Sequence, residues 1–162
     1  MAEIREIINE NELENSVKVI ADSFRTVAVE FNLTKDNCPT HPSFVTVKQL
    51  NEMKRKGLKL CGLFENDVQI GFVAVEKKKH KVFNLEKLAV LPEFRHKGYG
   101  GKLLEMTEDY VQKAGGDKLS IGIINEHTVL KKWYETKGFQ ETSVVKFEQL
   151  PFTVCFMEKT VG

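Results

Sequence analysis

A glycine-rich segment of eight residues constrains this chain more than any other part of its sequence. It reads Arg-His-Lys-Gly-Tyr-Gly-Gly-Lys over residues 95–102, after a strand-like run at 84–91 and before a helix-like run at 103–114. A strand that turns through glycines into a helix leaves backbone N–H groups unpaired at the positive end of the helix dipole. Such a junction suits a phosphate or pyrophosphate group. Four side chains can add positive charge there: Arg95, His96, Lys97 and Lys102.

The spacing of the glycines excludes two common phosphate-binding motifs. A dinucleotide-binding fingerprint requires a third glycine two residues beyond Gly101, where this chain has Leu103. A P-loop requires Ser or Thr after its Gly-Lys pair, and Lys102 is again followed by Leu103. What remains is Arg-x-x-Gly-x-Gly after a strand that ends near Pro92. The alternative is that these glycines only form a tight turn before a helix.

The Arg-x-x-Gly-x-Gly pattern resembles the coenzyme A pyrophosphate loop of the GNAT superfamily of N-acetyltransferases. A second segment, Trp133 to Phe139, is similar to the Tyr-x-x-x-Gly-Phe sequence of that family. Two motifs at a family-like separation are more specific than either one alone. The resemblance covers roughly residues 60–160, and the residues before them are compatible with it. It implies transfer of the acetyl group of acetyl-CoA to a primary amine by direct attack in a ternary complex.

The same resemblance implies an α/β (α+β) fold, the GNAT-like acyl-CoA N-acyltransferase fold. This fold has a mixed, mostly antiparallel sheet of about seven strands with helices on both faces. The order of elements along the chain agrees with it. Hydrophobic periodicity predicts helices over 13–31, 46–56, 103–114 and 128–137. Strand-like runs occupy 3–8, 58–64, 68–75, 82–90, 119–124, 139–147 and 152–157.

Size and composition limit the broad class of protein. A chain of 162 residues is expected to form a single N-acetyltransferase domain over residues 1–162. A net charge of +1 gives no reason to expect a nucleic-acid partner, and the basic run at 77–81 is interpreted as a solvated turn. No apolar run has the length of a membrane span, and the N-terminus does not resemble a signal peptide. The expectation is a cytoplasmic protein with no membrane partner.

The cysteines give no sign of a metal site. Cys38, Cys61 and Cys155 are an odd number at no metal-ligand spacing, which favours reduced thiols. None of them lies in a recognisable nucleophile–base arrangement, which agrees with direct transfer. We therefore expect no metal ion and no acyl-enzyme intermediate.

Acetyl-CoA is the cosubstrate that the resemblance implies. Its phosphates would bind backbone N–H groups of the glycine-rich segment, and its pantetheine arm would run beside the end of the preceding strand. The family often has an asparagine seven residues before its tyrosine, but that position here is His127, and Asn125 lies nine before. The implied coenzyme-binding residues are Leu88, Ala89, Val90, Arg95, His96, Lys97, Gly98, Tyr99, Gly100, Gly101, Lys102, Asn125 and His127.

Two side chains are the implied catalytic groups. Tyr134 matches the family tyrosine that lies near the sulfur of coenzyme A, and a phenol can protonate a leaving thiolate. Its alternative role is core packing beside Trp133. Glu86 lies four residues before Val90 on the same face of an apolar strand, where a partly desolvated carboxylate could act as general base. Its alternative role is a solvated partner of Lys87.

The acceptor is a small-molecule amine or a peptide or protein amine, which the sequence does not distinguish. Residues 37–44, with two prolines and several polar side chains, are either a recognition loop or a rigid cap over the core. The terminal strands could support a homodimer. Two rival hypotheses remain: a non-catalytic acyl-CoA-binding module, and a nucleotide-binding protein that uses the same anion site.

Overall fold

The fold centres on one sheet of seven strands within residues 2–162, the part of the chain that the computed structural model describes. The strands lie in the order β1-β2-β3-β4-β5-β7-β6, and each neighbouring pair is antiparallel except β4 and β5, which are parallel. Their bounds are β1 Ala2–Glu6, β2 Lys59–Glu65, β3 Val68–Lys79, β4 Val82–Val90, β5 Lys118–Ile124, β6 Gln140–Lys146 and β7 Thr153–Thr160. The prediction of a mixed, mostly antiparallel sheet is confirmed.

Local sequence signals explain where the helices begin and end. The α-helices are α1 Glu10–Glu30, α2 Val47–Arg55, α3 Tyr99–Lys113 and α4 Thr128–Thr136, with short 3₁₀ helices at Pro42–Phe44 and Pro92–Phe94. Asn9 with Glu12 forms a capping box at the start of α1, and Thr46 with Gln49 does the same for α2. Both boxes satisfy backbone N–H groups that a helix start leaves unpaired.

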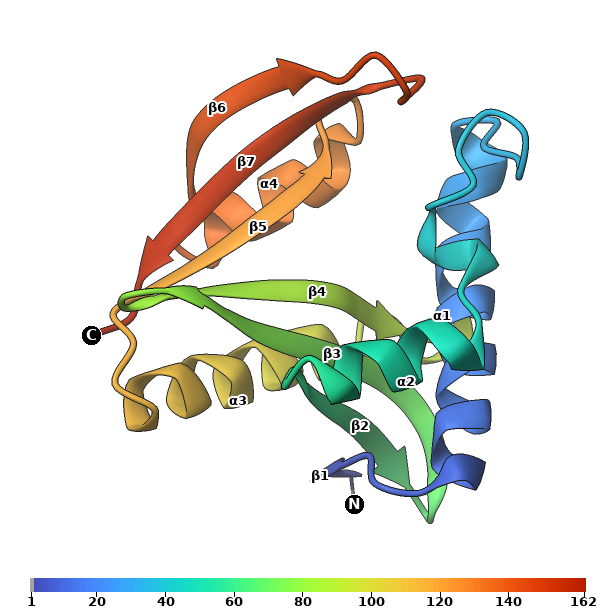
Figure 1. Cartoon of the computed structure of the whole chain (residues 1–162), viewed down its shortest axis with the longest axis vertical. Coiled ribbons are helices and arrows are strands. Elements are labelled where there is room, and N and C mark those ends of the chain that lie inside the picture. The colour runs from blue at the N-terminus through green and yellow to red at the C-terminus, as the bar shows by residue number, and fades with distance from the viewer. Residues whose placement is uncertain (1) are drawn as a thin grey trace.

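The helices cover both faces of the sheet (Figure 1). One buried cluster joins α3 and α4 to one face, through residues such as Leu63, Val73 and Leu104. A second cluster joins α1 and α2 to the opposite face, through residues such as Leu60 and Phe72. Leu60 and Leu63 belong to different clusters because alternating side chains of a strand point to opposite faces.

The sheet opens between its two parallel strands. β4 pairs with β5 only over Val82–Asn84 and Lys118–Ser120, after which the two strands diverge (Figure 1). β5 continues with β7 as its partner along its whole length, and β4 continues with β3. Beyond Asn84, the edge of β4 that faces β5 therefore has no strand partner. This opening is the structural feature on which the candidate site depends.

Three predicted elements need correction. The basic run at 77–81 is not a turn over its whole length, because β3 continues to Lys79 and the turn occupies His80 and Lys81. The third helix begins at Tyr99 instead of Leu103, so two of the segment's glycines belong to its first turn. The segment at 37–44, expected to be a loop or a rigid cap, is partly regular, since Pro42–Phe44 forms a 3₁₀ helix capped by the His41 side chain. Within residues 2–162, none of the helices combines the length and the apolar composition that a membrane crossing demands.

Candidate functional site

A β-bulge in β4 bends that strand at the opening. Phe72 of β3 pairs with Ala89 and Ala74 pairs with Glu86, so three residues of β4 advance while β3 advances two. Lys87 takes up the extra residue with φ of +55°, a left-handed conformation that non-glycine residues seldom adopt. Such strain in a central strand is typical of functional sites, where it redirects main-chain N–H and C=O groups.

The glycine-rich segment begins α3 with unpaired amides, as the sequence predicts. His96 and Gly98 have φ of +62° and +84°, and Gly98 is the helix N-cap without any side-chain hydrogen bond. Within residues 2–162, the backbone N–H groups of residues 96–101 find no protein acceptor, and the first helical bond is donated by Lys102 to the Gly98 carbonyl. These amides and the positive end of the α3 dipole are suited to an anion, and we call them the candidate anion site.

Trp133 of α4 and Lys137, the residue after that helix, lie beside these amides, and the sequence analysis named neither as a site residue. A Cβ on Gly101 would lie 3.3 Å from the Lys137 Nζ atom, and one on Gly100 would lie 3.4 Å from the Trp133 indole. The Lys137 ammonium also lies 5.6 Å from the Trp133 ring centroid, a cation–π distance. Lys137 thus adds positive charge beside the first turn of α3, although it lies 36 positions later in the sequence than Gly101.

The Arg95 side chain is held by hydrogen bonds within the protein instead of extending freely into solvent. Its guanidinium donates to the Ser23 carbonyl at 2.7 Å, to the Thr26 hydroxyl at 3.2 Å and to the Val90 carbonyl at 3.2 Å. These bonds tie the glycine-rich segment to α1 and to the end of β4. The side chain of Tyr99 is also engaged, since its hydroxyl donates to the Glu65 carboxylate. Coenzyme binding by either residue stays a prediction.

A cavity of about 420 Å³ occupies the opening between β4 and β5. Its walls come from four parts of the chain: α1 with the segment after it, β4 around the bulge, β5 with α4, and the β6–β7 hairpin. The lining residues are Phe24, Val27, Cys38, Thr40, His41, Pro42, Asn84, Leu85, Glu86, Lys87, Leu88, Ile121, Gly122, Ile123, Ile124, His127, Leu130, Tyr134, Leu150, Phe152, Val154 and Phe156. Both predicted catalytic residues, Glu86 and Tyr134, are among them. The prediction that Glu86 shares a face with Val90 is wrong, because the bulge puts Glu86 on the face of Ala89 instead.

Tyr134 lines this cavity from a tightly packed position. Only 4% of the residue is exposed, and its ring packs edge-to-face against Trp133 and Phe139 at 4.9 and 5.3 Å between centroids. Burial raises the pKa of Tyr134 well above that of an ordinary tyrosine. The phenol is therefore protonated at neutral pH and can donate its proton. Tyr134 is therefore both a packed core residue and a lining residue of the cavity.

Glu86 belongs to a short chain of hydrogen bonds at the base of the opening. The Asn84 amide donates to the Glu86 carboxylate at 3.3 Å, and the Ser120 hydroxyl donates to the Asn84 side-chain oxygen at 3.1 Å. Asn84 and Ser120 are also the last paired residues of β4 and β5. These bonds fix the orientation of Glu86 at the point where the strands separate. Asn84 and Ser120 were not predicted, because the contact joins two strands 36 residues apart.

Asn125 and His127 differ in their access to the cavity. His127 lines it, and its Nδ1 atom accepts a hydrogen bond from the Leu130 amide at 3.5 Å, capping α4. Asn125 does not line it, and its side-chain oxygen accepts from Lys131 at 3.0 Å. Burial chiefly lowers the pKa of His127, so its ring is neutral at neutral pH.

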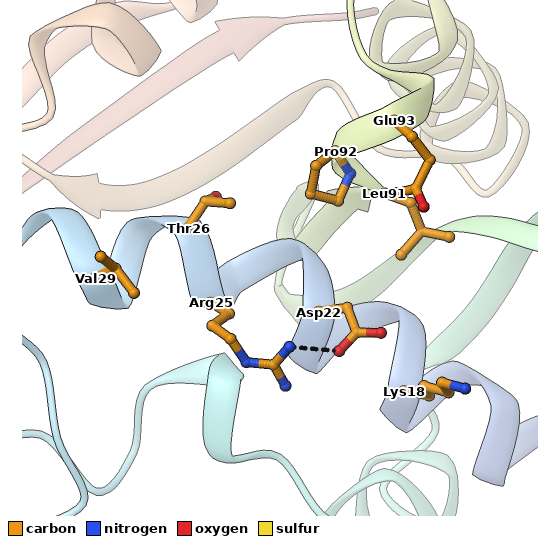
Figure 2. A pocket seen from close by; sticks show the side chains of 8 residues that line it. All are labelled: Lys18, Asp22, Arg25, Thr26, Val29, Leu91, Pro92 and Glu93. Atoms are coloured by element: carbon orange, nitrogen blue, oxygen red, sulfur yellow. Dashed lines mark hydrogen bonds and ion pairs between the residues drawn. The ribbon is translucent and has the colours of Figure 1, made fainter.

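A wider groove lies outside the opening and contains none of the predicted site residues. It runs between one side of α1 and the three residues that follow β4 (Figure 2). Arg25 and Asp22 on its floor form an ion pair at 2.8 Å with each other. Its lining residues are Lys18, Asp22, Arg25, Thr26, Val29, Leu91, Pro92 and Glu93. The smaller cavity is the candidate site because β4 at the bulge, Tyr134 and Glu86 all line it. In residues 2–162, His, Cys, Asp and Glu side chains form no cluster that could hold a metal ion.

Comparison with known proteins decides the family. The sequence pattern described as "Acetyltransferase (GNAT) domain" matches residues 29–161, most of the chain. The protein belongs to the GNAT acetyltransferase family. Two curated relatives are uncharacterised N-acetyltransferases. The protein of Methanocaldococcus jannaschii is 29% identical to this chain over 107 residues, and that of Bacillus subtilis is 29% identical over 82 residues. The matches cover 61% and 48% of this chain but only 46% and 55% of those proteins, so this chain spans about half of their length.

Solved structures show the same GNAT fold. The PaiA N-acetyltransferase of Thermoplasma acidophilum, crystallised with coenzyme A, superposes with a TM-score of 0.80 at 22% identity over 99% of both chains. The ribosomal-protein-S18-alanine N-acetyltransferase of Escherichia coli superposes with a TM-score of 0.78 at 16% identity, over 100% of this chain and 95% of that one. A GNAT acetyltransferase of Elizabethkingia anophelis with acetyl-CoA bound superposes with a TM-score of 0.60 at 19% identity, over 70% of this chain and 82% of that one. The predicted GNAT fold and family membership are confirmed.

Proposed function

We propose that this GNAT protein transfers the acetyl group of acetyl-CoA directly to a primary amine held in the same complex. The observation that carries the proposal is the single cavity in which the bulged edge of β4, the Glu86 carboxylate and the Tyr134 phenol come together. The unpaired amides of residues 96–101 lie just beyond the end of β4 and suit the coenzyme pyrophosphate. Crystallised GNAT relatives hold coenzyme A or acetyl-CoA, which supports this donor.

The reaction needs four roles, and the site offers a group for each. Main-chain amides at 96–101 hold the pyrophosphate, while the unpaired edge of β4 at Leu88–Val90 bonds the pantetheine arm. A main-chain N–H at the bulge polarises the acetyl oxygen, where negative charge develops. Glu86, directly or through water, takes a proton from the ammonium of the acceptor. The amine nitrogen then forms its bond to the carbonyl carbon.

Collapse of the tetrahedral intermediate breaks the carbon–sulfur bond, and the Tyr134 hydroxyl gives its proton to the departing thiolate. The nitrogen of the new amide loses its second proton, which restores the Tyr134 phenol, and the proton held by Glu86 leaves to solvent. A phenol is a weaker acid than a thiol by roughly 1.5 pKa units in water, and burial widens this gap by raising the pKa of Tyr134. The thiolate would form in the same desolvated cavity, which raises its own proton affinity and reduces this mismatch. No acyl-enzyme intermediate is needed, because the amine attacks the thioester directly.

Steady-state kinetics test this proposal. Thiol release from acetyl-CoA should depend on an added amine, and the kinetic patterns for the two substrates should intersect, as a ternary complex requires. Parallel patterns would indicate an acetyl-enzyme and contradict direct transfer. Tight acetyl-CoA binding without turnover of any amine would instead support a non-catalytic acyl-CoA-binding module.

The role of Glu86 has its own test. Glu86→Gln keeps the size and the hydrogen bond from Asn84 but removes the base, so kcat should fall by about a hundredfold. Glu93→Gln, on the segment that follows β4, serves as the matched control and should retain wild-type kcat. Identical pH–rate profiles for wild type and Glu86→Gln would remove Glu86 from the mechanism.

A further inference from the structure

The acceptor side of the cavity has a wall that the reaction chemistry does not explain. The β6–β7 connection reaches across to the segment after α1, where a third buried cluster forms (Figure 1). Ala28, Leu33 and Cys38 make up its centre, and Leu150 and Phe152 pack against it. Segments about 110 residues apart in the sequence therefore close the far end of the cavity from the donor. This wall is almost entirely apolar.

Three phenylalanines face the cavity, Phe24 from α1 and Phe152 and Phe156 from the β6–β7 hairpin. Aliphatic side chains also line the cavity, including Val27, Leu150 and Val154. Gly122 of β5 pairs with Phe156, and a Cβ on Gly122 would lie only 3.3 Å from the Phe156 ring. The missing side chain leaves room for the Phe156 ring against β5 on this wall of the cavity.

Charge is scarce on these walls. The formally charged side chains among the lining residues are Glu86 and Lys87, of opposite sign. The two lining histidines are neutral at neutral pH, since burial lowers the pKa of His41 to about 4 and also lowers that of His127. One carboxylate can pair with one ammonium group. A second ammonium on the same acceptor would meet apolar walls and the charge of Lys87.

We propose that the acceptor is a small primary monoamine with an apolar body, alkyl or aryl, and that polyamines are excluded. This inference rests on the proposed acetyltransferase function. The amine nitrogen lies at Glu86, near the point where β4 and β5 separate, and the apolar body extends toward the phenylalanines and the β6–β7 connection. Burial of that body stabilises the complex through the hydrophobic effect. A distal ammonium would lose its hydration without gaining a partner.

A matched pair of amines isolates this difference. Hexylamine and hexane-1,6-diamine share one carbon chain and differ only by the distal ammonium. Wild-type enzyme should acetylate hexylamine with a kcat/KM about a hundredfold higher, because an apolar site rejects an unpaired buried charge. Phenethylamine should behave like hexylamine, and spermidine like the diamine.

A single carboxylate placed in the wall should reverse the preference. Phe152→Asp offers a partner to the distal ammonium, so the hexylamine-to-diamine ratio should fall by about tenfold or more. Val144→Asp is the matched control, because Val144 lies on the same hairpin but is exposed and outside the cavity. Its ratio should equal that of wild type. A thermal melt of each variant establishes that it is folded.

Each outcome separates this inference from the function on which it rests. A diamine used as well as hexylamine by wild type would overturn the monoamine assignment while leaving amine acetylation in place. Turnover of none of these four small amines by enzyme that binds acetyl-CoA would overturn the small-monoamine assignment, and failure of peptide and protein amines as well would overturn the proposed function itself. The wild-type ratio is decisive even if Phe152→Asp fails to fold.

Discussion

At the scale of single residues, Tyr134 offers the sharpest test because its hydroxyl can be removed without its ring. Tyr134→Phe keeps the edge-to-face packing with Trp133 and Phe139. We expect kcat to fall by about tenfold or more, since the departing thiolate loses its proton donor. The dissociation constant of acetyl-CoA should stay nearly unchanged. Steady-state kinetics and titration calorimetry measure the two quantities separately.

Tyr110→Phe provides the matched control for this variant. Tyr110 packs against Phe83 with 6.2 Å between ring centroids and does not line the cavity. It should keep wild-type kcat. A Tyr134→Phe enzyme with an unchanged rate, or a loss shared equally by the two variants, would take Tyr134 out of the mechanism. Burial raises the pKa of Tyr134, so its phenol stays protonated up to the pH at which an ordinary tyrosine ionises. Below that pH, wild-type kcat should show no loss from ionisation of Tyr134.

His41 makes the stability of the protein depend on pH. Burial lowers its pKa from 6.5 to about 4, so protons bind more tightly in the unfolded chain. A depressed folded-state pKa contributes stability above pH 6.5, and this contribution is lost as pH falls from 6.5 to about 4. The loss amounts to about 3 kcal/mol at most.

Urea unfolding of wild type and His41→Asn over that pH range checks the prediction. Asparagine can still accept the hydrogen bond from the Ser43 amide but does not titrate. The free energy of unfolding should fall more steeply for wild type than for the variant between pH 6.5 and 4. Parallel slopes would show that His41 keeps an ordinary pKa in the folded protein.

At the scale of elements, the meeting of α3 and α4 decides how strongly the candidate anion site binds. The Lys137 ammonium lies beside the first turn of α3, so Lys137→Ala should weaken coenzyme A binding by about two- to fivefold. The effect should shrink at high salt, because exposed charges are screened. Lys113→Ala, at the opposite end of α3, is the control and should leave affinity unchanged. Equal affinities for wild type and Lys137→Ala at low salt would contradict the assignment.

Elements were predictable from the sequence where local signals decide their structure. Thr46 and Gln49 act within a few residues, so the start of α2 could be predicted closely, whereas the predicted starts at 13 and 103 lie a few residues after the observed starts of α1 and α3. The extension of β3 to Lys79 could not be predicted, because pairing with β4 overrides the low strand preference of lysine. The positions of Lys137 and Ser120 depend on contacts between distant segments. Periodicity carries no information about such contacts.

The site residues divide in the same way. Glu86 and Tyr134 could be named because the family resemblance pointed to them and because each lies on a recognisable strand or helix. The inward anchoring of Arg95 could not be predicted, since its acceptors are Ser23 and Thr26 of α1 and the Val90 carbonyl. The apolar character of one cavity wall could not be predicted from the sequence, for the same reason. It forms only when the segment after α1 meets the β6–β7 connection.

At the scale of the whole molecule, the two parts of the sheet share only a short parallel ladder at Val82–Asn84 and Lys118–Ser120. A ligand that fills the opening must therefore bridge edges that no strand covers. In the free protein, amides on these edges exchange with solvent by small local openings. A bound pantetheine arm would act like an added strand, and a bound pyrophosphate would accept from the amides that begin α3.

Hydrogen exchange with and without acetyl-CoA locates these contacts. Saturation at about a hundred times the dissociation constant stabilises the folded state by about 2.7 kcal/mol, which slows every amide that exchanges through global unfolding. Amides that exchange by local opening slow down only where the ligand touches them. We expect such local protection at residues 85–90 and 96–101 and none in β1. Slowing spread evenly over the chain, or confined to the groove beside Arg25, would place the coenzyme elsewhere and contradict the site proposed between β4 and β5.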